Sequence, residues 1–416
     1  MYRREYTSDW DFRDSNTKEY THCYHNYPAM MIPQIARRLI CDFAPEGSVK
    51  MILDPYMGSG TTLVEAAIRG IDSVGIDINP LARFIAEVKT TRFDISEVEE
   101  SFKYILRKID SFDMNAWEYV ETDFEHITKH DYWYSKENLI KLKYLSSVIN
   151  GIEFAATKPF FNLALAEIIR DVSFTRNGEF KRYRIDAEKI PTYNPNPFVL
   201  IADKVRRNLD GLNDFLKDAL EFTVNISDCN SVYKIPNSLL AKDSVDMVVT
   251  SPPYGDSRTT VAYGQFSRWA SEWFKFPNAK NIDRTLMGGV PKKIDAINTD
   301  ALAMELALIK QSDIKRYYEV VTFLDEYSQS IKNVASVVRK GGRVCYVVGN
   351  RTVKEVQIPL DYFTAEMFEK NGFKHEITYV RSIPNKRMPS KTSPSNKKGA
   401  NVNTMTEEYI VIMTKL

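Results

Sequence analysis

A glycine-containing turn followed by an acidic residue is the first group of residues that could bind a small molecule. The turn spans residues 54–62, reads Asp-Pro-Tyr-Met-Gly-Ser-Gly-Thr-Thr, and lies between an apolar stretch at 49–53 and a helical pattern at 61–69. Asp77 ends the next apolar stretch, seventeen residues after Gly60. In a strand–turn–helix–strand unit, the glycines let a ligand approach the backbone and the acidic residue accepts hydrogen bonds from ribose hydroxyls. The spacing therefore predicts a nucleoside-binding site.

The residue types in this turn narrow the choice of ligand. The turn lacks both the lysine of a phosphate-binding loop and the G-x-G-x-x-G spacing of a dinucleotide fold. Asp54 would repel a pyrophosphate, but it suits a cation. The ligand should therefore carry a positive charge for Asp54 and a ribose for Asp77. S-adenosylmethionine has both, because its ammonium and sulfonium groups are positive and its ribose can pair with Asp77. A turn that only connects a strand to a helix is the alternative.

A second group of polar residues follows another apolar strand, at the end where open α/β sheets bind their ligands. It consists of Ser251, Pro252, Pro253 and Tyr254, directly after the stretch 245–250. The two prolines stiffen the turn and lack N–H groups. Ser251 and a neighbouring carbonyl can hold an exocyclic amine, and Tyr254 offers a ring on which an extruded base could stack. A purely structural proline turn is again the alternative.

Taken together, these motifs resemble those of the S-adenosylmethionine-dependent amino-methyltransferases that modify exocyclic nitrogens of DNA bases. Residues 54–61 look like the family's D-P-F-x-G-S-G-T motif, with Tyr56 in place of Phe. The Thr-Ser-Pro-Pro-Tyr sequence at 250–254 is similar to that of N4-cytosine enzymes, whereas Asp-Pro-Pro-Tyr is typical of N6-adenine enzymes. Residues 25–39, with Tyr27 and Pro28, resemble a motif that packs over the methionine moiety. Asp228 stands where the family places a residue near the adenine amino group.

The resemblance implies a function and a set of site residues. The function is methyl transfer to N4 of a cytosine flipped out of double-stranded DNA, with a separately encoded restriction endonuclease as the partner of such an enzyme. N6-adenine methylation, RNA amine methylation and a non-catalytic nucleic-acid-binding scaffold stay open as alternatives. Ser251, Pro252, Pro253 and Tyr254 would form the catalytic turn. The residues expected to bind the cofactor are Tyr27, Pro28, Asp54, Tyr56, Gly58, Gly60, Thr61, Asp77, Ile78 and Asp228.

These residues need a sheet to position them. Short apolar stretches that alternate with helical patterns predict an α/β fold with a doubly wound, Rossmann-like parallel sheet, and the stretches 375–381 and 408–413 predict an antiparallel closing pair. Residues 93–220 are rich in helical patterns, which predicts a mainly helical insertion. The family resemblance implies a target-recognition domain, and this insertion is the candidate for it, because the methyl-transfer fold itself does not need it. It would divide the methyltransferase domain into residues 1–92 and 221–416. The segment 255–312 reads as loop-rich and is the alternative candidate for sequence recognition.

Two segments combine basic residues with features suited to DNA. In the segment 174–184 the basic residues are Arg176, Lys181, Arg182 and Arg184, which are interleaved with aromatic residues. Within the Pro/Ser/Lys-rich segment 382–401, which we expect to form an exposed loop, they include Lys386 and Arg387. Cations can pair with phosphates or base edges, and aromatic rings can stack on bases. Solvated surface loops are the alternative, because charge runs are common on surfaces.

Composition excludes several classes of protein. The 416 residues carry a formal net charge of +1, with 44% hydrophobic and 27% charged residues, as in an ordinary globular protein. No apolar stretch approaches the roughly 20 residues of a membrane span, and the charged N-terminus does not resemble a secretory signal, so a cytoplasmic protein is expected. The four cysteines show no CxxC pairing, His126 and His130 lack a third ligand, and no metal site is expected. Oligomeric state stays open.

Overall fold

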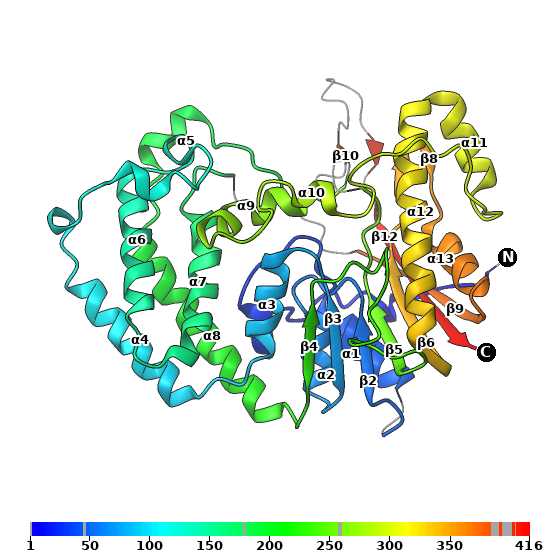
Figure 1. The fold of residues 1–416 in the computed structure, drawn as a ribbon, viewed down its shortest axis with the longest axis horizontal. Helices are drawn as coiled ribbons and strands as arrows, with labels where there is room; N and C mark the ends of the chain where they lie inside the picture. The colour runs from blue at the N-terminus through cyan, green and yellow to red at the C-terminus, as the bar shows by residue number, and fades with distance from the viewer. Residues whose placement is uncertain are drawn as a thin grey trace.

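A mixed sheet forms the centre of the computed structural model, which describes residues 2–44, 47–176, 178, 180–256, 260–383, 391–392, 402–403 and 405–416. Within these ranges the sheet has eight strands in the order β1-β9-β12-β6-β5-β2-β3-β4 (Figure 1). The strands are β1 (Arg4–Tyr6), β2 (Met51–Asp54), β3 (Asp72–Ile76), β4 (Val224–Ser227), β5 (Val245–Thr250), β6 (Val338–Val348), β9 (Phe373–Ser382) and β12 (Glu407–Lys415). Short strand pairs outside the sheet are β7 (Thr352–Val353) with β8 (Val356–Gln357), and β10 (Lys391–Thr392) with β11 (Val402–Asn403).

Strand directions follow the predicted α/β arrangement. Strands β4, β3, β2, β5 and β6 pair in parallel, and β12 pairs antiparallel with both β6 and β9. The predicted doubly wound sheet with an antiparallel closing pair is therefore confirmed. Strand β1, which pairs in parallel with β9, was not predicted, because three mostly charged residues give no apolar pattern.

Helices cover both faces of the sheet, because consecutive strand residues point to opposite sides. Ile52 and Met247 pack with α1 on one face. Leu53 and Val248 belong to the core on the other face, which α12 and α13 cover. The helices around the sheet are α1 (Pro33–Phe43), α2 (Thr61–Ala67), α3 (Pro80–Thr90), α10 (Ile282–Thr285), α11 (Ala303–Ser312), α12 (Ile314–Val337) and α13 (Leu360–Glu369).

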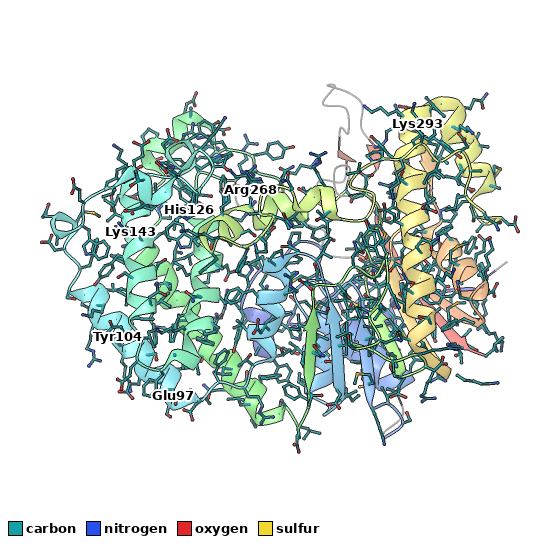
Figure 2. All side chains as sticks on the ribbon, viewed as in Figure 1. Glu97, Tyr104, His126, Lys143, Arg268 and Lys293 are labelled. Carbon is teal, nitrogen blue, oxygen red and sulfur yellow. The ribbon has the colours of Figure 1, made fainter. Side chains whose placement is uncertain are left out.

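A second body of helices, which we call the helical lobe, lies beside the sheet on the left of Figure 1. It consists of α4 (Ile95–Asp110), α5 (His130–Trp133), α6 (Lys136–Asn150), α7 (Lys158–Asp171), α8 (Pro197–Asp218) and α9 (Tyr263–Trp273). These helices share an apolar core of their own with α3. Figure 2 places Tyr104, His126 and Lys143 on this lobe, and Lys293 on the other side of the molecule, near α12.

Helix α9 corrects the interpretation of 255–312 as loop-rich. Trp269 Nε1 donates to Thr175 Oγ1 at 3.1 Å and Trp273 Nε1 donates to Ser146 Oγ at 3.0 Å, so α9 is docked onto the lobe. Helical spacing is present in its apolar residues Phe266, Trp269, Ala270 and Trp273, and this spacing could have predicted the helix from the sequence. Of the helices described, none has the length and apolar character needed to cross a bilayer.

Replacing Gly60, the residue before α2, tests how tightly the glycine-containing turn is packed. Its φ is +76°, and a Cβ there would lie 2.8 Å from Ala86 Cβ. Gly60→Ala should therefore lower the free energy of unfolding by about 2–5 kcal/mol, as the sum of left-handed backbone strain and overpacking. Gly47 has a similar φ of +75°, with no described atom within 4 Å of its added Cβ, so Gly47→Ala should cost only about 1–2 kcal/mol. Equal losses in chemical denaturation would show that contact with Ala86 contributes nothing.

Candidate active site

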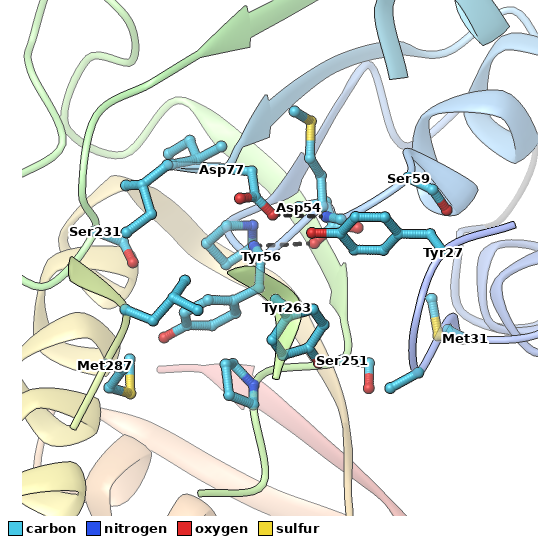
Figure 3. Close-up of a pocket in the computed structure, with 18 of the residues that line it drawn as sticks. Tyr27, Met31, Asp54, Tyr56, Ser59, Asp77, Ser231, Ser251, Tyr263 and Met287 are labelled. Atoms are coloured by element: carbon cyan, nitrogen blue, oxygen red, sulfur yellow. Dashed lines mark hydrogen bonds between the residues drawn. The ribbon is translucent and has the colours of Figure 1, made fainter. Parts of the chain in front are cut away.

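The two predicted groups of polar residues meet in one cavity at the carboxyl ends of β2, β3 and β5 (Figure 3). Parallel strands bring these ends to the same edge of the sheet. The predicted site residues that line the cavity are Tyr27, Pro28, Asp54, Tyr56, Gly58, Thr61, Asp77, Ile78, Ser251 and Pro253. Gly60, Pro252, Tyr254 and Asp228 are not among the residues that line it.

Asp77 is held at the end of β3 by two backbone groups. The Gly58 N–H donates to one carboxylate oxygen at 3.1 Å, and the Asn79 N–H donates to the other at 2.8 Å. These bonds connect the glycine-containing turn to the start of α3. Burial raises the pKa of Asp77 to about 6, against the opposing effect of the two N–H donors.

Asp54 connects the ends of β2 and β5. Its Oδ1 accepts a hydrogen bond from the Thr250 hydroxyl at 2.6 Å and another from the Tyr56 N–H at 3.2 Å. Burial raises the pKa of Asp54 to about 6 as well. The cavity therefore contains two carboxyl groups whose ionisation is more difficult than in water.

Aromatic rings close another side of the cavity. Tyr27 and Tyr263 stack with ring centroids 5.9 Å apart, and the Tyr27 hydroxyl accepts a hydrogen bond from Asn79 Nδ2 at 2.9 Å. The Tyr27 ring also contacts the turn at Gly58, where an added Cβ would lie 3.6 Å from the ring. Tyr263, on α9, was not predicted, because nothing in its local sequence places α9 beside the cofactor turn.

After β4, the residues that line the cavity begin one position after the predicted Asp228. Cys229 and Asn230 line the cavity, whereas Asp228 lines a neighbouring polar pocket together with Arg83 and Arg284. The direction of each side chain after a strand depends on the local turn, which the position of an acidic residue in the sequence does not reveal. Leu286 and Met287 also line the cavity without having been predicted.

The Ser-Pro-Pro-Tyr turn presents Ser251 and Pro253 to the cavity, while Pro252 is buried. The Tyr254 hydroxyl lies 3.2 Å from Ser251 Oγ and donates to Glu408 Oε1 at 3.0 Å. Its ring packs against the end of β6, where an added Cβ on Gly349 would lie 2.7 Å from Tyr254 Cδ2. The hydroxyl of Tyr254 is thus directed into a hydrogen-bonded chain.

Two basic residues of the segment 174–184 pack against aromatic rings of the helical lobe. Arg182 lies over the Trp269 ring at 4.7 Å and Arg184 lies over the Tyr132 ring at 4.0 Å. Arg176 forms an ion pair with Asp186 at 2.9 Å, and Lys181 is half-buried. Lys386 and Arg387 lie outside the described residues.

Potential metal ligands are dispersed in the structure. In the ranges described, no three His, Cys, Asp or Glu side chains are grouped so that they could hold a metal ion. His130 Nε2 lies 3.1 Å from the Tyr119 hydroxyl. Burial lowers the pKa of His126.

A doubly wound sheet that holds a nucleoside-type cavity beside a Ser-Pro-Pro-Tyr turn defines the class of amino-methyltransferases. Residues 2–87 match the family model described as DNA methylase. The chain is 38% identical to the type II methyltransferase M.MvaI of Kocuria varians over 424 residues, covering 97% of this chain and 92% of that protein. It therefore belongs to the type II, S-adenosylmethionine-dependent DNA methyltransferases.

Other comparisons cover less of the chain. The type II methyltransferase M.BsoBI of Geobacillus stearothermophilus is 27% identical over 267 residues, 58% of this chain and 50% of that protein. The crystal structure of a DNA modification methylase from Thermus thermophilus, complexed with S-adenosyl-L-methionine, is 20% identical in sequence. It covers 44% of this chain and 51% of that chain, with a TM-score of 0.21.

The raised pKa values predict how cofactor binding depends on pH. In the free protein the pKa values of Asp54 and Asp77 are both about 6, and a cationic ligand with ribose hydroxyls favours the ionised carboxylates. Binding should lower both pKa values, so affinity for S-adenosylmethionine should be full above about pH 7 and fall as the pH drops through 6. Calorimetric titrations between about pH 5 and 8 would measure this change, and a flat profile would contradict it.

The same shifts have the opposite effect on the stability of the free protein. Both carboxyl groups bind a proton more tightly in the folded state than in the unfolded state, where the pKa is 3.8. Their contribution to stability is therefore present below pH 3.8 and is lost as the pH rises through 6.

Proposed function

We propose that this enzyme transfers a methyl group to the exocyclic N4 of a cytosine that is flipped out of double-stranded DNA. The observation that carries the proposal is that Ser251 lines the same cavity as Asp54 and Asp77. A cofactor held by the two carboxylates and an amine held at Ser251 would meet at the ends of β2, β3 and β5. Duplex bases hide their exocyclic nitrogens, so the target base has to leave the stack.

The residues around the cavity suit S-adenosylmethionine. When bound, this cofactor supplies a methyl group activated by a sulfonium. Asp77 would accept hydrogen bonds from the ribose hydroxyls, and Asp54 would face a positive group. The Tyr27 and Tyr263 rings, stacked at one side, would keep water from the reacting atoms.

The proline turn suits an amine acceptor. Pro252 and Pro253 have no N–H groups and fix the backbone after Ser251. An amine that donates to the Ser251 hydroxyl and to a carbonyl of this turn would have its lone pair directed toward the methyl donor. Ser251 occupies the position at which N4-cytosine enzymes of the family carry serine and N6-adenine enzymes carry aspartate, which supports cytosine as the target.

The product identifies the target base. DNA from cells that express the enzyme should contain N4-methylcytosine when its nucleosides are separated by mass spectrometry. Cells that express Ser251→Ala provide the matched control. N6-methyladenine as the product would contradict the proposal and establish adenine as the substrate. A type II system would also include a separately encoded endonuclease for the same DNA sequence.

We infer that the helical insertion, residues 93–220, recognises the DNA sequence, and that α9 supports it. The contacts of Arg182 with Trp269 and of Arg184 with Tyr132 hold two guanidinium groups against rigid rings. Such ordering reduces the entropy lost when an arginine binds a guanine edge. Because the net charge is only +1, DNA binding has to depend on local positive groups of this kind.

Arginine variants can separate base recognition from phosphate contact. Arg182→Ala and Arg184→Ala should each weaken binding to the methylated sequence by about 1–3 kcal/mol and leave binding to a scrambled duplex nearly unchanged. Arg206→Ala is a matched control. Like the two tested arginines, Arg206 lies over an aromatic ring, that of Phe102 at 6.0 Å, but it is on α8 and outside the basic segment. Binding measured at several salt concentrations would show equal losses on both duplexes if the contacts are to phosphates. No change on either duplex would exclude both roles.

A further inference from the structure

Strand β12 brings a carboxylate to the Ser-Pro-Pro-Tyr turn. Glu408 Oε1 accepts a hydrogen bond from the Tyr254 hydroxyl at 3.0 Å, although the two residues are 154 positions apart in the chain. The Tyr254 hydroxyl also lies 3.2 Å from Ser251 Oγ. Ser251, Tyr254 and Glu408 thus form a continuous chain of hydrogen-bonding groups that begins at the cavity.

The Glu408 carboxylate is held in place from β9. Glu408 and Arg381 are directly opposite in the β12–β9 register, and Arg381 Nη1 lies 3.6 Å from Glu408 Oε2. Arg381 is 4% exposed, whereas the Glu408 side chain is 19% exposed. The neighbouring Glu407 points elsewhere and accepts a hydrogen bond from the Tyr409 hydroxyl at 3.0 Å. Only the second glutamate of this pair reaches the catalytic turn.

The carboxylate determines the direction of the whole chain. A tyrosine hydroxyl has one proton and an ionised carboxylate has none, so Tyr254 must donate to Glu408. The bond between Ser251 and Tyr254 must then be donated by Ser251. Both lone pairs of Ser251 Oγ are left to accept a hydrogen bond. Burial and the nearby Glu408 charge raise the pKa of Tyr254, which keeps its hydroxyl protonated.

We propose that Glu408 is a positioning residue for methyl transfer, which orients Ser251 as an acceptor for the target amine and receives the proton that this amine loses. The proposal rests on the proposed function, because it needs an amine at Ser251. It extends that function to a residue outside both motifs.

The step balances in atoms and electrons. The amine lone pair forms the new N–C bond, and the S–C bond breaks with its electron pair passing to sulfur, which becomes a neutral thioether. The amine proton passes to Ser251 as the Ser251 proton passes to Tyr254 and the Tyr254 proton to Glu408. The products are a neutral methylated amine and a protonated Glu408, whose partial exposure lets it return the proton to water.

Glu408→Gln tests the proposal with little change in shape. A neutral amide can present either a donor or an acceptor to Tyr254, so it removes both the direction of the chain and the proton acceptor. Single-turnover transfer of tritiated methyl groups to DNA should slow by at least about tenfold. Affinity for S-adenosylhomocysteine, measured by calorimetry, should stay within about twofold of the unchanged enzyme. Glu407→Gln, the matched control on the same strand, should alter neither quantity.

A double variant shows whether the residues act as one chain. Because Tyr254→Phe removes the link between Ser251 and Glu408, adding Glu408→Gln to it should cause little further loss. Multiplicative losses would overturn the proposal. It would also be overturned by Glu408→Gln transferring methyl groups at the unchanged rate, or by a parallel loss of rate and S-adenosylhomocysteine affinity.

The product of the same reactions separates this inference from the proposed function. N6-methyladenine formed slowly by Glu408→Gln would contradict cytosine as the target and support the role of Glu408. N4-methylcytosine formed at the unchanged rate would contradict only the role of Glu408.

Discussion

Replacing Ser251 with alanine should slow methyl transfer by about 10- to 100-fold and leave cofactor affinity nearly unchanged. Ser251 faces the cavity from the end of β5, where the amine of the target base is proposed to bind. The amine develops positive charge as it attacks the methyl group, and a hydrogen bond to a charged group contributes about 1.5–3 kcal/mol. A bond that strengthens as the charge develops lowers the barrier more than it lowers the energy of the bound substrate.

The rate and the affinity have to be measured separately. Single-turnover methyl transfer reports the rate, and calorimetry with S-adenosylhomocysteine reports the cofactor site. Ser244→Ala is a suitable control, because Ser244 precedes the other end of β5 and donates to the Ala241 carbonyl at 2.7 Å. A Ser251→Ala enzyme with a normal rate would show that this hydroxyl does not hold the acceptor amine.

Replacing Asp77 with alanine should weaken S-adenosylmethionine binding by about 10- to 100-fold. The change removes the proposed bonds from the carboxylate to the ribose hydroxyls, worth about 1.5–3 kcal/mol. It also removes the acceptors of the Gly58 and Asn79 N–H groups, so the glycine-containing turn loses its connection to α3. Asp77→Asn keeps one oxygen acceptor without the charge and should give an intermediate affinity.

Asp72 provides the control for this result. It lies at the start of β3, where its carboxylate accepts a hydrogen bond from the Thr223 N–H at 2.8 Å, and Asp72→Asn should leave cofactor affinity unchanged. Calorimetric titration of each variant at about pH 7.5 measures the effect with the carboxylates ionised. Unchanged affinity in Asp77→Ala would mean that the nucleoside binds elsewhere.

Sequence alone was sufficient for the elements that depend on neighbouring residues. Apolar stretches that end in Asp54, Asp77 and Thr250 predicted parallel strands, and the glycines and prolines after two of them predicted the turns. Because parallel strands end at one edge of a sheet, the sequence also indicated that Asp54, Asp77 and Ser251 would meet. The shared cavity agrees with this reasoning. Backbone sterics and side-chain periodicity act over a few residues, which explains this success.

Tertiary structure decided which distant side chains complete the site. Tyr263 reaches Tyr27 because α9 docks on the helical lobe, and Glu408 reaches Tyr254 because the register of β12 places it opposite Arg381. A shift of that register by one residue would turn Glu407 toward the catalytic turn instead. Such contacts depend on how whole elements pack and align. The order of residues along one element contains little information about that packing and alignment.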